Sequence, residues 1–250
     1  MKNKKIALCI SGAPRNHHCV DFVKRIAQDY ETCVFINYWG CEDVIKEHMW
    51  ITKTCEIGFE PEIYRVNNVH LEYSSQLFSD MIPTFEDVRK QILPERLCRK
   101  DLGTISMCYS IKRSNDLREA YETKHGFKFD CVFRLRFESS FRPGRRLLFR
   151  SGPHEDYREI VHQGPEEDPM NYKFNIEDYN LNYIWIPDCN VDAKYGMCDM
   201  FGFSTSENMS HYMTVYDRIV ELSNKECHWG EGIFWHNISH IGKAWQPKMW

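Results

Sequence analysis

Two arginines and a carboxylate stand at alternate positions near the middle of this 250-residue sequence. They are Arg134, Arg136 and Glu138, at the end of an apolar run that begins after Asp130. Alternate side chains of a β-strand share one face, so the three charges are expected on the same side of the chain. A guanidinium binds phosphate oxygens through paired hydrogen bonds, and a carboxylate can hold a divalent cation. The run therefore predicts a diphosphate site at the carboxyl end of a strand, where open α/β sheets bind ligands.

The same three charges have a second interpretation. Glu138 would then neutralise Arg134 and Arg136 in an internal ion-pair network that binds no ligand. The strand pattern alone gives equal weight to the two interpretations.

The elements that must position this run follow from the spacing of apolar residues. Residues 5–11 predict a first strand, apolar positions from Cys19 to Tyr30 predict a helix, and residues 32–39 predict a second strand. A strand, a helix and a strand in this order form a βαβ unit with parallel strands. The length of 250 residues suits one domain. The predicted fold class is therefore α/β, with a mostly parallel central sheet flanked by helices in a single domain of residues 1–250.

The rest of the chain yields further elements. Strand-like pieces are expected at residues 51–57, 62–66 and 183–186. Four helices are predicted from apolar residues at helical spacing. The first begins at Thr84 and is interrupted by Pro94, and the second runs from a cap at Thr104 to a stop at Gly126. The third begins at the capping-box sequence Ser204 to Glu207, and the fourth begins near Glu231. Residues 142–182 are rich in Pro and Gly and are predicted to be irregular.

Composition excludes several functional classes. The net charge is −4, from 32 basic and 36 acidic residues, so no overall positive field favours nucleic acid. No apolar run approaches the roughly 20 residues that span a bilayer. The 11 cysteines are scattered, without a CxxC pair, and several fall in apolar patterns. We therefore expect a soluble, cytoplasmic protein with reduced cysteines and no membrane span.

Four segments occur in an informative order: KIALCISGAPR at residues 5–15, VFINYW at 34–39, FDCVFRLRFE at 129–138 and CDMFGFS at 198–204. This order resembles the GT-A-type glycosyltransferases encoded by large chlorella viruses and by some bacteria. The resemblance implies a GT-A-like, Rossmann-like fold with a donor-binding part at about residues 1–140 and an acceptor and catalytic part at about 141–250. It also implies transfer from a nucleotide-diphosphate sugar, a UDP-sugar by analogy, to a glycan or glycoprotein hydroxyl. For a viral protein the location would be the host cytoplasm.

The resemblance also implies donor-binding residues outside the charged run. Gly12 would let the nucleotide approach the backbone closely, and Arg15 would reach its base or phosphate. On the long helix, Ser106, Ser110 and Arg113 line the flank that resembles the family's donor-binding helix. Each has an ordinary alternative, because Arg15 can be a plain loop arginine and helix serines often pack or bond to their own helix.

The catalytic centre of GT-A enzymes commonly includes a DxD triplet that ligates manganese or magnesium. The matching triplet here is Arg136-Phe137-Glu138. Glu138 stands where the family's RxRxD pattern has aspartate, so a divalent cation is one alternative and diphosphate binding by arginines alone is the other. Asp199 is the candidate base for the acceptor hydroxyl, with Glu231 in reserve. Asp199 can equally orient a loop, and Glu231 can stabilise a helix start.

Two other functions compete with sugar transfer. A protein that kept the fold and binds a glycan or nucleotide sugar without catalysis would also lack DxD. A nucleotide-dependent phosphotransferase is disfavoured, because no GxxxxGK[ST] loop follows the first strand.

Overall fold

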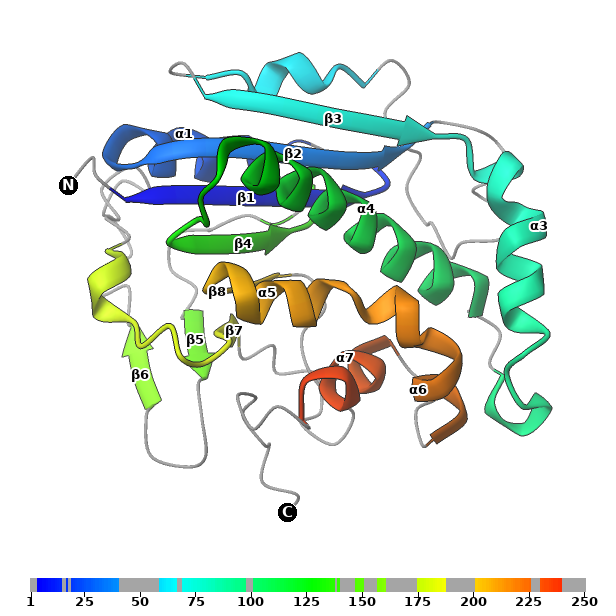
Figure 1. The fold of residues 1–250 in the computed structure, drawn as a ribbon. Coiled ribbons are helices and arrows are strands. Elements are labelled where there is room, and N and C mark those ends of the chain that lie inside the picture. The colour runs from blue at the N-terminus through cyan, green and yellow to red at the C-terminus, as the bar shows by residue number, and fades with distance from the viewer. Residues whose placement is uncertain are drawn as a thin grey trace.

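The computed structural model describes residues 4–14, 17, 19–40, 59–66, 69–97, 101–137, 139, 147–150, 157–160, 175–187, 201–225 and 230–239. Within them the chain forms a layered α/β domain with a central sheet between helices, as Figure 1 shows. The predicted fold class, α/β with a mostly parallel sheet, is confirmed.

The central sheet has the strand order β3-β2-β1-β4-β8. Its first four strands are parallel, and β8 pairs antiparallel with β4. The strands are β1 (Lys5–Gly12), β2 (Glu31–Trp39), β3 (His70–Gln76), β4 (Cys131–Leu135) and β8 (Phe201–Ser204). Because β1, β2 and β4 are parallel, their carboxyl ends meet at one edge of the sheet, which we call the carboxyl edge.

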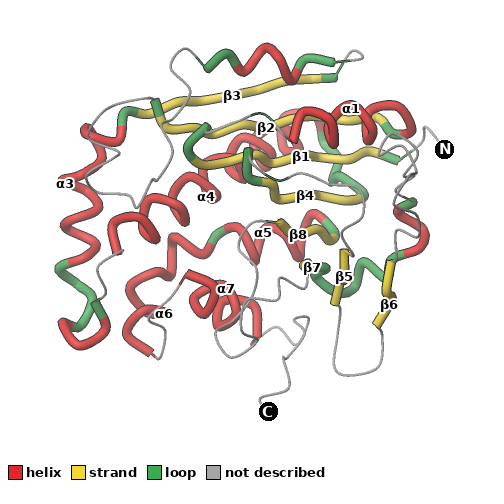
Figure 2. Tube along the Cα trace, turned by 180° about the vertical axis from the view of Figure 1, so that it is seen from behind, coloured by secondary structure: helices red, strands yellow, loops and turns green. Residues whose placement is uncertain are grey.

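Helices cover both faces of this sheet. The helices are α1 (Cys19–Asp29), α3 (Phe78–Arg89), α4 (Asp101–His125), α5 (Ser206–Met213), α6 (Ile219–Lys225) and α7 (Gly230–Ser239). The long α4 crosses one face and α1 packs on the other, as the opposite views in Figures 1 and 2 show. Short 3-10 turns occur at Pro61–Tyr64, Pro94–Arg96, Ile176–Asp178 and Val215–Arg218.

Alternation along the strands divides the core into two layers. Ala7 and Cys9 of β1 and Phe35 of β2 pack toward α4 and the C-terminal helices. Ile6 and Leu8 point the other way, toward α1. The strands are apolar on both faces because both faces are covered, which is usual for parallel sheets.

Several predicted element boundaries are confirmed. The first βαβ unit forms with β1 and β2 parallel. Gly126 ends α4 in a left-handed conformation, with φ of 69°, and the Gly126 and Phe127 N–H groups donate to the Glu122 carbonyl at 2.9 and 3.3 Å. Helix α7 begins at Gly230, one residue before the predicted Glu231.

Other boundaries differ from the predictions. Residues 62–66 do not form a strand, because Pro61 opens a 3-10 turn there. Helix α4 begins at Asp101, so Thr104 is not its cap; Leu102 and Ile105 already pack into the core and extend the helix. Helix α5 is capped by Thr205, whose hydroxyl accepts from the Asn208 N–H at 3.3 Å.

The stretch predicted to be irregular contains strands. Strands β5 (Leu147–Arg150) and β6 (Tyr157–Ile160) pair antiparallel and join β7 (Ile186–Pro187) in a small second sheet. Trp185 forms a bridge to Phe203, which ties the segment before β7 to the central sheet. The strand expected at 51–57 lies outside the described residues.

Two properties of the described residues bear on the expected environment. No helix there combines the length and apolarity needed to cross a bilayer. The cysteines in those ranges are buried and carry free thiols: Cys9, Cys19, Cys33, Cys108 and Cys131.

Candidate functional site at the carboxyl edge

Strand β4 carries the first residue of the predicted charged run, Arg134. Phe133 packs on the α1 side, whereas Val132 and Arg134 alternate to the α4 side. Arg134 is 1% exposed, and its backbone lies between Cys9 of β1 and Gly202 of β8. The predicted alternation is confirmed for these residues, and it places a buried guanidinium close to the carboxyl edge.

Arg136 follows the last residue of β4 and is half-buried. Its N–H donates to Ser139 Oγ at 3.0 Å, and the Ser139 N–H donates back to the Arg136 carbonyl at 2.9 Å. These bonds fix the backbone of Arg136 at the end of β4. Glu138, the predicted metal ligand, lies outside the described residues, and both the ion-pair network and the ligand site stay predictions.

Gly12 ends β1 in a conformation that favours glycine, with φ of 118°. Its N–H donates to Ser110 Oγ of α4 at 3.0 Å. The preceding Ser11 is 1% exposed, and its hydroxyl finds no hydrogen-bond partner among the described residues. Strand alternation places Ser11 on the α4 side, the same side as Arg134.

The three helix residues predicted to bind the donor lie in different surroundings. Ser110 is fully buried and bonded to Gly12. Ser106 is also buried, and its hydroxyl donates to the Gly103 carbonyl of its own helix at 3.0 Å. Arg113 is partly exposed and pairs with Asp116, with Nη1 and Oδ2 3.1 Å apart. Contact of these residues with a nucleotide stays a prediction.

Asn37 is a residue of this region that the sequence analysis did not identify. It lies opposite Ser11 in the register of β1 and β2 and is fully buried. Its side chain accepts from Ser110 Oγ at 2.9 Å and donates to Gln76 Oε1 at 2.8 Å. A polar residue inside the apolar run VFINYW was the available signal, because a buried amide needs dedicated partners.

The antiparallel strand β8 brings a further segment to the same edge. Its first residue, Phe201, lies opposite Leu135, the last residue of β4. The chain therefore enters β8 at the carboxyl edge, beside the end of β4. Asp199 precedes β8 by two positions in the sequence and lies outside the described residues, as Arg15 does. Glu231 lies in α7, but its side chain is outside the described part.

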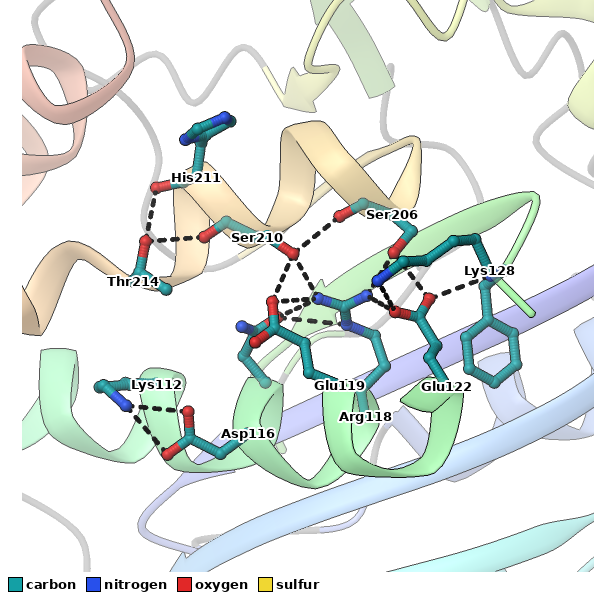
Figure 3. Close-up of polar contacts among 12 residues, drawn as sticks. Lys112, Asp116, Arg118, Glu119, Glu122, Lys128, Ser206, Ser210, His211 and Thr214 are labelled. Carbon is teal, nitrogen blue, oxygen red and sulfur yellow. Dashed lines mark hydrogen bonds and ion pairs between the residues drawn. The ribbon is translucent and has the colours of Figure 1, made fainter. Parts of the chain in front are cut away.

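A second polar cluster connects α4 with α5 away from the carboxyl edge (Figure 3). We call it the α4–α5 network; its members are Asn115, Arg118, Glu119, Glu122, Ser206 and Ser210. The Arg118 guanidinium is fully buried and donates to Glu122 Oε2 at 2.9 Å and to Glu119 Oε1 at 3.0 Å. Its remaining N–H groups reach Asn115 and the two serines, so each of its nitrogens has a partner.

Glu122 is the principal counter-charge in this network. Burial raises the pKa of Glu122, but hydrogen bonds from Lys128, Ser206 and the Phe129 N–H, together with the Arg118 charge, outweigh burial and leave the pKa below its ordinary value. Glu122 therefore stays ionised, with Arg118 and the exposed Lys128 as its counter-charges, and the network is a structural element.

Metal ligands are not grouped in the described residues: no three His, Cys, Asp or Glu side chains there are close enough to hold an ion. Glu138 is not among these residues, so a divalent cation stays a prediction.

No protein-family model matches the chain, and no curated protein shows significant similarity to it.

The carboxyl edge thus combines a buried guanidinium, a second arginine, a buried hydroxyl and a left-handed glycine. Positive charge beside a buried hydroxyl suits an anionic, oxygen-rich ligand. A phosphate group is the simplest such ligand, and the edge is the usual place for one in an open α/β sheet.

Proposed function

We propose that the chain is a glycosyltransferase that moves a sugar from a nucleotide-diphosphate donor, a UDP-sugar, to a hydroxyl of a glycan or glycoconjugate. The observation that carries the proposal is the position of Arg134, a buried guanidinium beside the carboxyl edge of a mostly parallel sheet. The GT-A-like arrangement and the division into donor and acceptor halves belong to the same proposal.

The arginines would act on the leaving group. Cleavage of the bond between sugar and diphosphate leaves negative charge on the diphosphate oxygens. Arg134 and Arg136 would stabilise that charge by electrostatic interaction and bidentate hydrogen bonds. A cation held by Glu138 would add to this stabilisation, and its contribution is tested by chelation.

Asp199 would take the proton from the acceptor hydroxyl. The entry of the chain into β8 beside the end of β4 supports this role, because Asp199 precedes Phe201 by only two positions in the sequence. Glu231 is the alternative base, and the variants Asp199→Asn and Glu231→Gln separate the two.

The test is release of free nucleotide from a panel of UDP- and GDP-sugars, with and without EDTA. We expect turnover with one donor class, and a loss of about 100-fold in kcat for Arg134→Met, because one stabilising donor at a developing charge contributes this much. Arg65→Met is the matched control, since Arg65 is exposed and pairs only locally with Glu62, 2.7 Å away among the described contacts. Absence of nucleotide binding and of turnover with every donor would refute the proposal.

A non-catalytic binding protein is the second candidate. It predicts that UDP raises the melting temperature while no donor is hydrolysed or transferred. The same thermal-shift experiment with ATP and GDP measures nucleotide preference.

A further inference from the structure

We infer that Ser110 and Asn37 are positioning residues that hold the end of β1 in the conformation that receives the donor nucleotide. This inference rests on the proposed function and adds two residues that act through Gly12. It assigns Ser110 to the support of the donor site instead of direct contact with the nucleotide.

A chain of hydrogen bonds starts at Gly12. The Gly12 N–H donates to Ser110 Oγ at 3.0 Å, and the same hydroxyl donates to Asn37 Oδ1 at 2.9 Å. The hydroxyl has a single proton, so accepting from Gly12 leaves that proton for Asn37. Ser110 therefore links β1 to β2 through the helix that covers them.

The chain continues from Asn37 to β3. The Asn37 amide donates to Ser74 Oγ at 2.9 Å and to Gln76 Oε1 at 2.8 Å. Both polar atoms of the amide are thus hydrogen-bonded: the oxygen accepts from Ser110, and the nitrogen donates to β3. Asn37 and Ser110 are 0% exposed, so water cannot replace these partners.

These contacts have a consequence for Gly12. Its N–H points inward to Ser110 and is not available to a ligand. Gly12 would assist the donor by its backbone conformation and by the absence of a side chain, as its φ of 118° indicates. The conformation at this position depends on the Ser110 hydroxyl, because that hydroxyl anchors the last amide of β1.

The chain offers a matched control on the same helix. Ser114 lies one turn beyond Ser110 and is also 0% exposed, but its hydroxyl donates to the Ile111 carbonyl of its own helix at 2.8 Å. Ser114→Ala removes the same atom from the same depth without removing a hydrogen bond to β1. Ser74→Ala is a milder variant, since Asn37 keeps Gln76 as a partner.

The experiment measures two quantities in the full chain: hydrogen–deuterium exchange of peptides containing Gly12, and the Kd for UDP. In Ser110→Ala we expect the Gly12 amide to exchange about tenfold faster and the Kd to rise about tenfold, since a buried N–H loses its partner. Ser114→Ala should leave both within about twofold of wild type, with Ser74→Ala between them. In turnover assays Ser110→Ala should raise the KM for the donor more than it lowers kcat.

Two outcomes would overturn the inference: equal Gly12 exchange in Ser110→Ala and Ser114→Ala, or faster exchange with an unchanged Kd for UDP. If wild type binds no UDP or UDP-sugar, the proposed function fails and the donor role of the two residues fails with it. Faster Gly12 exchange in Ser110→Ala would then still show that Ser110 holds the end of β1. Failure of the proposed function is therefore distinguishable from failure of the inference about Ser110.

Discussion

Two halves of one helix make different use of buried polar residues. The inner ridge of α4 carries a polar side chain at every fourth position, and all five are at most 1% exposed: Ser106, Ser110, Ser114, Arg118 and Glu122. Near the carboxyl edge the ridge is neutral, and Ser110 reaches the ends of β1 and β2. Farther along it is charged, and Arg118 and Glu122 bind α5.

The neutral and charged halves of the α4 ridge should differ in their effects on stability and on ligand binding. A buried ion pair leaves an uncompensated charge when one partner is removed, so loss of the charged half should damage the whole fold. A neutral hydroxyl leaves one unpaired amide, a smaller and more local cost. The charged half should therefore determine stability, and the neutral half should determine the conformation of the edge that binds ligand.

The largest effect is expected for Arg118→Met. It removes the buried partner that Glu122 and Glu119 share, leaves Glu122 with the exposed Lys128 as its counter-charge, and should lower the free energy of unfolding by about 3 kcal/mol. Urea titration followed by circular dichroism measures this change. Arg65→Met, an exposed arginine, should cost less than about 0.5 kcal/mol. Equal costs for the two variants would contradict the distinction between the halves.

Acidification should weaken the charged half selectively. The pKa of Glu122 is lower in the folded protein than its ordinary value. Its stabilising contribution is therefore complete above the ordinary carboxyl pKa of about 4.3 and is lost as the pH falls through the lower, folded value. The urea midpoint of wild type should fall more steeply below that pH than the midpoint of Glu122→Gln. Glu207→Gln, an exposed residue of α5, should follow wild type; parallel curves for all three proteins would exclude Glu122 as the group responsible.

Two glycine substitutions compare the carboxyl edge with the helix itself. Gly12→Ala meets no atom within 4 Å of the added Cβ but must adopt φ of 118°, so it should cost about 2 kcal/mol and weaken UDP binding. Gly103 lies inside α4, also with no atom within 4 Å of an added Cβ. Gly103→Ala should stabilise by about 0.5–1 kcal/mol through helix propensity. Thermal unfolding of both variants measures the contrast, and a shift of the same sign in both would contradict it.

The smallest effect is expected in the alkylation of Cys9, which reports whether α4 stays packed on the sheet. Burial raises the pKa of Cys9 to about 12, although the Arg118 charge acts in the opposite direction. At pH 8 the folded thiol should not react with iodoacetamide, in wild type or in Ser110→Ala. Arg118→Met should expose it to modification. Peptide mass spectrometry distinguishes Cys9 from the other cysteines, and modification in Ser110→Ala would show that the neutral half also holds the helix in place.

Apolar spacing and local turn residues were sufficient for the first βαβ unit and for parts of α4 and β4. They predicted β1, α1 and β2, the end of α4 at Gly126 and the alternation of Arg134 in β4, because each depends on residues close in sequence. They failed for β3, whose sequence HLEYSSQ lies at the sheet edge with alternate residues exposed. They also failed for β5 and β6, in a stretch where Pro and Gly suggested a loop.

The candidate site was only partly predictable for a similar reason. The two arginines were identified from the strand-end pattern, where local sequence is informative, and Gly12 from the family resemblance. Asn37 was missed because its partners, Ser110 and Gln76, are far from it in the chain.

The sequence by itself determined an α/β fold and the face of the strand on which Arg134 lies, since period-two alternation is a local property of the backbone. Only the tertiary structure decided that β8 runs antiparallel beside β4 and that the polar ridge of α4 divides into a neutral and a charged half. Those features depend on which distant segments pack together, and buried polar groups acquire their roles from partners that the packed fold brings to them.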